Sequence, residues 1–248
     1  HKTQGELISL VGLISVLASL CRFMKPEDLR LLDTVITSSA RMRQFLTQPA
    51  STNSHHNHRH GLLLHTVETC LQVLILLASK WSEITRILSE DPSSERHLKY
   101  SERHFDWASG VAQGIACGVL HDFGKIGEYE DLGNGAYALS DSGLFLGHQL
   151  KVCLWVYHAA MSSEYSEHDR LRELIHCLSA VDRQHDQSGL RSRKTFIAKI
   201  VNQADRLSAG HRGAFVHEFH SWLTGDYFGT VHGLQTYKQK GVRNVQQA

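Results

Sequence analysis

The sequence predicts an all-α protein, a helical bundle interrupted by one small loop or hairpin. Apolar residues recur at the three-to-four-residue spacing of a helix along most of the chain, and 42% of its 248 residues are hydrophobic. Only three prolines occur, at Pro26, Pro49 and Pro92, so long stretches are free to be helical. A chain of this length can bury a sizeable core as one large domain, with or without appendages.

The expected helices follow one another with few interruptions. The segment Pro26-Glu27-Asp28 suits a helix start, because it places proline in the first turn and acids near the positive end of the helix dipole. Residues 127–143 hold four glycines and show little apolar periodicity, which predicts the loop or small hairpin. Helices are expected over residues 4–22, 26–48, 61–88, about 105–122, 144–162, 167–182 and 194–208.

The same pattern divides the chain into three parts. Residues 1–48 are expected to form N-terminal helices that pack on the core, and residues 49–224 the main domain. Residues 225–248 hold few large apolar side chains, so a loosely packed tail is expected there. The chain starts at His1 without a methionine, which favours a fragment of a longer product.

Cysteine usage and charge restrict the setting and the partners. The five cysteines lie in apolar helical patterns without a C-x-x-C pair, which favours reduced core residues in a cytoplasmic protein. The apolar run from Leu7 to Cys21 is interrupted by serines and a glycine and is shorter than the ~20 residues that span a bilayer, so no membrane span is expected. The formal net charge is +1, so any nucleic-acid contact must be local.

Several side chains of metal-ligand type sit in or beside the apolar, helix-patterned segments. These are His65, the adjacent pair His121 and Asp122, His148 and Asp205. Burying carboxylates or imidazoles is costly unless they are paired or bound to a cation, and a divalent metal is the simplest shared reason. Because the ligands are imidazoles and carboxylates rather than thiolates, they suit one or two ions of Mn, Fe, Mg or Zn.

Short motifs surround these ligands. His121 and Asp122 open an HD-x-G-K signature that ends at Lys125, and Gly147-His148 follows the glycine-rich stretch. The two remaining motifs are His55-His56-Asn57-His58-Arg59-His60-Gly61-Leu62-Leu63-Leu64-His65 and Ala204-Asp205-Arg206-Leu207-Ser208-Ala209. Over about residues 49–209 the chain thereby resembles the HD superfamily of metal-dependent phosphohydrolases. It is closest to the HD domains of TraI-like (MobH-type) conjugative relaxases and YhaM-type nucleases, which often carry two glycines where this chain has His60-Gly61.

The resemblance implies the fold of an HD-domain helical bundle and a role for each residue. Asp122 would bridge two ions and Lys125 would stabilise the charge of the transition state. His56, His58 and Arg59 would hold substrate phosphate, with a solvated polar loop as the alternative. The implied metal ligands are His65, His121, Asp122, His148, Asp182 and Asp205.

Asp182 enters this set as a substitute. Relatives with two metals usually carry a His-His pair that falls near Val181-Asp182 by spacing, and this chain lacks the pair. Asp182 ranks first as the replacement and His176 second, whereas His185 fits a surface histidine.

The implied function is that of a metal-dependent phosphodiesterase or nuclease, as in a conjugative relaxase domain that nicks DNA. Single-stranded DNA or another nucleic acid, together with proteins of the conjugation machinery, would be its partners. Two alternatives remain open: a di-iron HD oxygenase, and a noncatalytic, metal-stapled helical module of a conjugation complex. Tyr129 and Tyr137 in the loop after the metal motif fit ordinary loop aromatics, with base stacking as the alternative.

Overall fold

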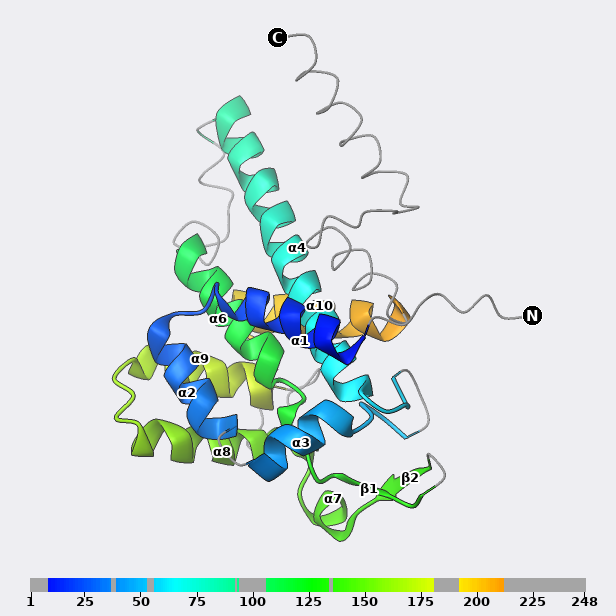
Figure 1. Ribbon diagram of the computed structural model, residues 1–248. Helices are drawn as coiled ribbons and strands as arrows, with labels where there is room; N and C mark the ends of the chain where they lie inside the picture. Colours follow the sequence, from blue (N-terminus) through cyan, green and yellow to red (C-terminus); the bar gives the residue numbers. More distant parts are fainter. Residues whose placement is uncertain are drawn as a thin grey trace, which may run out of the picture.

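The computed structural model describes residues 9–36, 39–52, 56–91, 93, 106–133, 136–180 and 192–211. Within these residues the protein is a helical bundle with one two-stranded sheet, which confirms the predicted all-α class (Figure 1). In chain order the elements are α1 (Leu10–Cys21), α2 (Pro26–Ile36), α3 (Ser39–Thr47), α4 (Gly61–Glu90), α6 (Trp107–Leu120), the 3₁₀ turn η2 (Phe123–Lys125), β1 (Tyr129–Asp131), β2 (Tyr137–Leu139), α7 (Asp141–Phe145), α8 (His148–Ser162), α9 (His168–Ser179) and α10 (Phe196–His211).

Helix α4 is the centre of the bundle. Residues 61–73 are buried on every side, because α10 and α6 pack against them and α1 and α3 cover the remaining faces. Close packing with α6 requires glycine, since a Cβ at Gly118 would lie 3.0 Å from the sulfur of Cys70. The first half of α4 is therefore a rigid support for any side chain it carries.

The length and apolar composition of α4 raise the possibility of a membrane-spanning helix. Among the described residues it is the one helix long and apolar enough to cross a membrane, and 78% of its most apolar 18-residue window is buried inside the bundle. Such burial is typical of the core helix of a globular domain.

The N-terminal helices share the core of the rest of the chain. Side chains of α1, α2 and α3, such as Leu20, Leu31 and Phe45, belong to one continuous buried cluster with residues of α4, α6 and α8. The single helix predicted over 26–48 is wrong, because α2 and α3 are separate elements. The guanidinium of Arg41 in α3 donates to the carbonyl of Val35 near the end of α2, at 2.7 Å, and so satisfies a helix-terminal acceptor.

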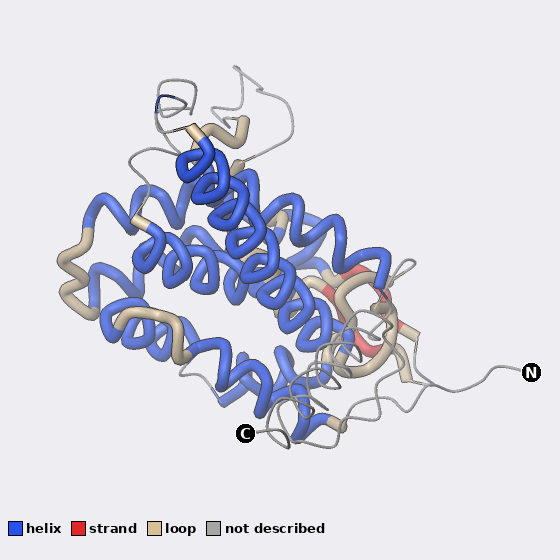
Figure 2. The backbone as a smooth tube through the Cα atoms, turned by 90° about the horizontal axis from the view of Figure 1, so that it is seen from above, coloured by secondary structure: helices blue, strands red, loops and turns tan. Residues whose placement is uncertain are grey.

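The small hairpin predicted after the metal motif is present. Strands β1 and β2 pair antiparallel, with Tyr129 opposite Leu139 and Asp131 opposite Tyr137. Figure 2 shows the strands at one end of the bundle, outside its helical core. The hairpin separates η2 from α7 and α8, which returns the chain to the bundle beside η2.

Other bounds differ from the expectations in smaller ways. The helix expected over 144–162 is broken at Leu146 and Gly147 into α7 and α8, and Ser140 caps α7 by accepting from the amide of Gly143. The helices expected over 167–182 and 194–208 are α9 and α10. The proposed boundary at residue 224 and the tail 225–248 lie outside the described residues.

Candidate metal centre

The start of α4 positions His65 in the core. A Cβ at Gly61 would lie 2.0 Å from the carbonyl oxygen of His56, so glycine lets the preceding loop fold back over the helix. His56 itself has a left-handed backbone, with φ of 55°, and its carbonyl accepts from the amide of Ala50 at 2.9 Å. One helical turn after Gly61, the side chain of His65 points into the centre of the bundle, where it is 1% exposed.

The end of α6 supplies the next two residues. His121 closes the helix, and its Nδ1 lies 2.7 Å from the carbonyl oxygen of Gly118. Asp122 follows at the entry to η2, where its side chain is buried. A Cβ at Gly124 would lie 1.9 Å from the carbonyl oxygen of His148, so glycine in the HD-x-G-K signature permits the start of α8 to approach the centre.

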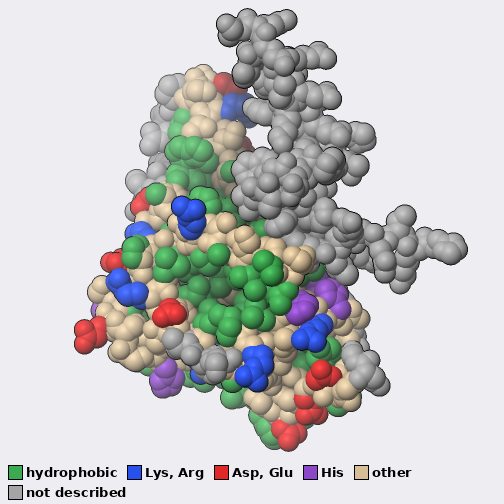
Figure 3. Space-filling model, viewed as in Figure 1, with side chains coloured by type: hydrophobic (Ala, Val, Ile, Leu, Met, Phe, Trp, Pro, Cys, Tyr) green, Lys and Arg blue, Asp and Glu red, His purple; other side chains and the backbone are tan. Residues whose placement is uncertain are grey.

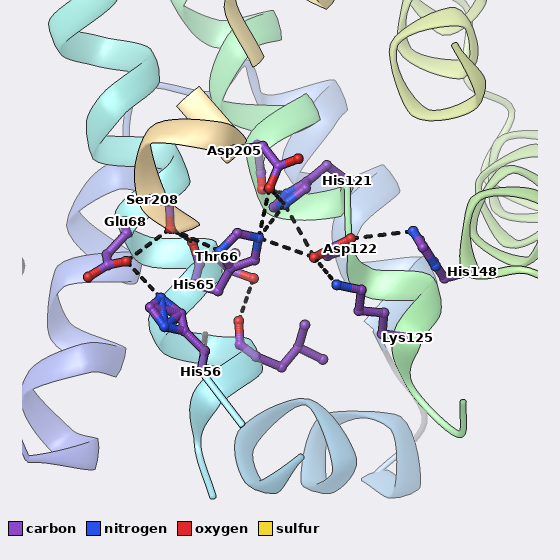
Figure 4. A network of polar contacts seen from close by, with 12 residues as sticks. His56, His65, Thr66, Glu68, His121, Asp122, Lys125, His148, Asp205 and Ser208 are labelled. Carbon is purple, nitrogen blue, oxygen red and sulfur yellow. Dashed lines mark hydrogen bonds and ion pairs between the residues drawn. The ribbon is translucent and has the colours of Figure 1, made fainter. Parts of the chain in front are cut away.

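Four side chains meet at one point (Figure 4). The Nε2 atom of His65 lies 3.1 Å from Nε2 of His121, 3.2 Å from Oδ2 of Asp122 and 3.1 Å from Oδ1 of Asp205. Metal–ligand bonds of about 2.1 Å at right angles would separate neighbouring ligand atoms by about 3.0 Å. His65, His121 and Asp122 can therefore hold a metal ion. Asp205 lies beside this group, with Oδ1 3.1 Å from Nε2 of His65 and 3.9 Å from Nε2 of His121.

Hydrogen bonding at the far side of each imidazole directs a lone pair to this point. The carbonyl oxygen of Gly118 can only accept a hydrogen bond. Its contact with Nδ1 of His121 therefore places the proton of the neutral ring on Nδ1. Nδ1 of His65 lies 2.9 Å from Oγ of Ser208, whose hydroxyl donates to Glu68 at 2.9 Å, so His65 also donates from Nδ1. In these neutral tautomers two nitrogen lone pairs and two carboxylates converge, an arrangement that favours a bound cation.

The charges show the same demand for a cation. Burial lowers the pKa of His65, yet hydrogen bonds and charges from Asp122 and Asp205 outweigh it and raise the pKa to about 9. Burial raises the pKa of Asp122, but Lys125, His121 and His65 hold it well below its usual value. The ammonium of Lys125 lies 2.6 Å from Oδ2 of Asp122. Without an ion, a proton and the Lys125 ammonium compensate the carboxylates.

The other oxygen of Asp122 faces His148, the first residue of α8. Nε2 of His148 lies 3.6 Å from Oδ1 of Asp122, and Nδ1 lies 3.5 Å from Oε2 of Glu128. That Glu128 oxygen is buried and has no hydrogen-bond partner among the described residues. The carboxylate of Asp122 thus lies between two imidazole groups, as a bridging ligand would.

A buried network supports His65 from behind. Glu68 lies on α4 beyond His65, and its Oε2 accepts from Ser208 of α10. The same oxygen lies 2.8 Å from Nε2 of His56, whose side chain is 1% exposed. Carboxylate groups behind ligating histidines fix the tautomer and orientation of the ring. Glu68, Ser208 and Glu128 are residues that the motif-based reasoning did not assign.

The predicted substrate-binding residues are not equivalent in the structure. His56 is buried and bonded to Glu68, so in this conformation it supports the metal centre and is not accessible to a phosphate. The difference arises because the left-handed turn at His56 directs the loop inward. His58 and Arg59 are exposed, as the phosphate role requires. Figure 3 shows one face of the molecule, on which histidines lie beside a basic side chain.

The sixth predicted ligand cannot be placed. Asp182 and His185 lie outside the described residues, so their assignment stays a prediction. His176 is half-buried, and its Nε2 accepts from the amide of Lys194 at 3.0 Å, which ties α9 to the segment before α10. A cavity of about 70 Å³ above the centre is lined by His121, Asp122, His148, Asp205, Ala180, Arg193 and neighbours from α8, α9 and α10.

No protein-family model, curated protein or solved structure matches this chain. The functional argument consequently rests on the geometry and charge of the centre and on the motifs quoted above.

Proposed function

We propose that the protein is a metal-dependent phosphodiesterase that acts on nucleic acid. The observation that carries the proposal is the convergence of His65, His121 and Asp122 beside the buried ammonium of Lys125. A divalent ion held there would supply Lewis acidity toward a phosphoryl oxygen and toward the attacking water. The small cavity over the centre gives a substrate oxygen access to the ligands from the side of α8 and α9.

Lys125 has a separate task in this proposal. Burial lowers its pKa, but Asp122 raises the pKa above the ordinary value, so the side chain stays protonated at neutral pH. A fixed ammonium beside the ion favours the extra negative charge that a phosphoester gains in its transition state. Lys125 donates to the Oδ2 oxygen that also faces His65, which keeps the ammonium next to the reacting phosphate.

The finer assignment follows from the motifs. The similarity to TraI-like relaxases favours single-stranded DNA as substrate and proteins of a conjugation complex as partners, and the similarity to YhaM-type nucleases favours RNA. The near-neutral chain, with a net charge of +1, is consistent with a substrate held locally.

The test measures bound metal and hydrolysis on the same preparations. Wild-type protein should carry divalent metal and hydrolyse a small aryl phosphodiester and a single-stranded oligonucleotide. Asp122→Ala should lose both the metal and the activity, because it removes the carboxylate shared by His65, Lys125 and His148. Asp33→Ala, at an exposed position of α2, is the matched control and should change neither.

Lys125→Ala separates binding from chemistry. It should retain the metal and slow hydrolysis of both substrates by roughly 100-fold, the usual loss when one group that stabilises transition-state charge is removed. Metal retained by Asp122→Ala would contradict the proposed centre. Metal without turnover on any phosphoester would favour the noncatalytic module, and bound iron with an oxygen-dependent optical change would favour the oxygenase.

A further inference from the structure

A second cavity lies beside the hairpin, apart from the small cavity over the metal centre. Its volume is about 400 Å³, within the range of small-molecule pockets, about 300–1,000 Å³. It opens between α3 and the two strands, which lie next to each other in Figure 1. We call it the hairpin cavity and define it by the lining residues Gln44, Thr47, Gln48, Tyr129, Asp131 and Tyr137.

The walls of the hairpin cavity are fixed by hydrogen bonds. The amide group of Gln48 donates to the carbonyl of Tyr129 at 3.0 Å and accepts from the amide of Gly127 at 3.2 Å, which ties the hairpin to the end of α3. The hydroxyl of Ser140 donates to the carbonyl of Gly127 at 2.6 Å and closes the base of the hairpin. These bonds hold both strands at the base of the hairpin, so a ligand bound against this part of the wall would lose little free energy in ordering it.

The chemistry of the lining restricts the ligand. Two half-buried tyrosines offer aromatic faces and Gln44 offers an amide, as a flat, polar, aromatic ligand requires. Asp131 shares the face of the hairpin that carries Tyr129 and Tyr137, and its carboxylate would repel a phosphate and favour a ligand that donates hydrogen bonds. A nucleobase with an exocyclic amino group has both properties.

The position of the cavity connects it to the metal centre. Burial and the Glu128 carboxylate raise the pKa of Tyr129, whereas the ammonium of Lys125 lowers it, so this phenol lies within electrostatic reach of Lys125. Burial and Asp131 raise the pKa of Tyr137, and the guanidinium of Arg59 lowers it. The backbone of Lys125 is also close to the hairpin, because its carbonyl oxygen accepts from the amide of Glu128 at 2.8 Å, immediately before β1. Cationic groups that suit a phosphate therefore lie beside a cavity whose own lining repels one.

We propose that the hairpin cavity binds one base of a single-stranded nucleic acid, stacked against Tyr137 and Tyr129, while the adjoining phosphate lies toward Lys125 and Arg59. The proposal rests on the proposed function for its catalytic meaning, because the bound base would select which phosphodiester enters the metal centre. Binding of the base itself requires no turnover. Stacking tolerates every base, whereas the carboxylate of Asp131 favours cytosine and adenine over thymine.

The test compares the affinity of the protein for two strands that share a backbone, one with bases and one without. A fluorescent single-stranded pentanucleotide of deoxycytidine and an abasic pentanucleotide are titrated in chelator, and anisotropy gives both affinities. The wild-type protein should bind the deoxycytidine strand at least fivefold more tightly than the abasic strand. Tyr137→Ala should lose that preference, a change of about five- to 100-fold, because one base–aromatic stack is removed.

Further variants keep the test independent of hairpin folding. Tyr137→Phe retains the ring and should retain the preference, and Gln44→Ala, on the exposed face of α3, should reduce it without touching the hairpin. Tyr157→Ala, an exposed tyrosine of α8, is the matched control. Equal binding of the two strands by wild type, or equal losses on both strands in Tyr137→Ala, would overturn the proposal. Hydrolysis of the small aryl phosphodiester by wild type tests the proposed function separately.

Discussion

The two oxygens of Asp122 face environments of different depth. On the Oδ2 side, His65 and His121 come from the core helices α4 and α6, and their side chains are 1% and 10% exposed. On the Oδ1 side, His148 comes from the edge helix α8 and is 30% exposed. The two histidines on the Oδ2 side therefore come from the core, whereas His148 on the Oδ1 side lies at the surface, as does the 42% exposed side chain of Asp205.

The difference in depth is also a difference in support. His65 is oriented through a hydrogen bond of 2.9 Å to Ser208 and onward to Glu68, all within the core. His148 has Glu128 at 3.5 Å, longer than a good hydrogen bond, and its ring is partly open to solvent. We therefore expect the Oδ2 side to bind an ion tightly and the Oδ1 side to bind one weakly.

Removal of one imidazole at a time should show the largest difference in metal binding between the Oδ2 and Oδ1 sides. His65→Ala should abolish stoichiometric metal binding, because His65 contacts His121, Asp122 and Asp205 at the shared point. His148→Ala should leave one ion bound with near-normal affinity. Isothermal titration with Mn²⁺ measures both, and circular dichroism in chelator checks that each variant is folded.

The result for His148→Ala has two informative alternatives. Loss of all metal would mean that the two sides bind metal as one unit, which would contradict the expected difference between a tight side and a weak side. Unchanged stoichiometry together with full activity on a phosphodiester would mean that His148 has no part in the centre.

The sequence predicts more of the residues on the core side of the centre than on the edge side. Apolar periodicity predicts α4, α6 and α10, and the cost of burying charge identifies His65 and Asp122. Asp205 is 42% exposed, so it is identified by its motif and not by burial. The same cost of burying charge applies to Glu68, which lies in the fully buried part of α4 and is 1% exposed, so its burial could have been inferred. Its partners could not, because Ser208 lies 140 positions away in sequence.

Loop geometry accounts for the remaining differences. His56 lies in a polar run that resembles a solvated loop, and its contact with Glu68 shows that the ring turns inward. The predicted single helix over 26–48 missed a break because a boundary within a polar stretch carries weak local signals. Glu128 was unassigned because it follows the HD-x-G-K signature in a segment without periodicity.

Changes to the residues that orient the ligand histidines should affect metal affinity less, and by different amounts on the two sides. Ser208→Ala removes the acceptor for His65 Nδ1 and should weaken metal binding by about 10- to 100-fold. Glu128→Gln should weaken it by less than about tenfold, because solvent can replace a long contact at the partly exposed His148 ring. Competition with a fluorescent chelator measures both affinities. A larger loss in Glu128→Gln than in Ser208→Ala would reverse the proposed order of support.

The smallest effect on the centre is expected from the backbone contact that brings the edge to the core. In Gly124→Ala the new methyl group would meet the carbonyl of His148 at 1.9 Å, so α8 must shift away from η2. Gly147→Ala is the matched control, since φ is −58° there and a Cβ would meet nothing within 4 Å. We expect Gly124→Ala to lower the melting temperature by a few degrees, since overpacking typically costs about 1–3 kcal/mol and 1 kcal/mol corresponds to about 2–4 °C in a domain of this size. The variant should retain the tightly bound ion, because His65 and His121 do not depend on α8, and should bind the weaker one with slightly lower affinity. Equal melting temperatures for the two alanine variants would mean that the close approach of α8 to the HD-x-G-K turn adds nothing to stability. Other contacts of α8, such as its packing on α2 and α9, would then have to hold the Oδ1 side of the centre in place.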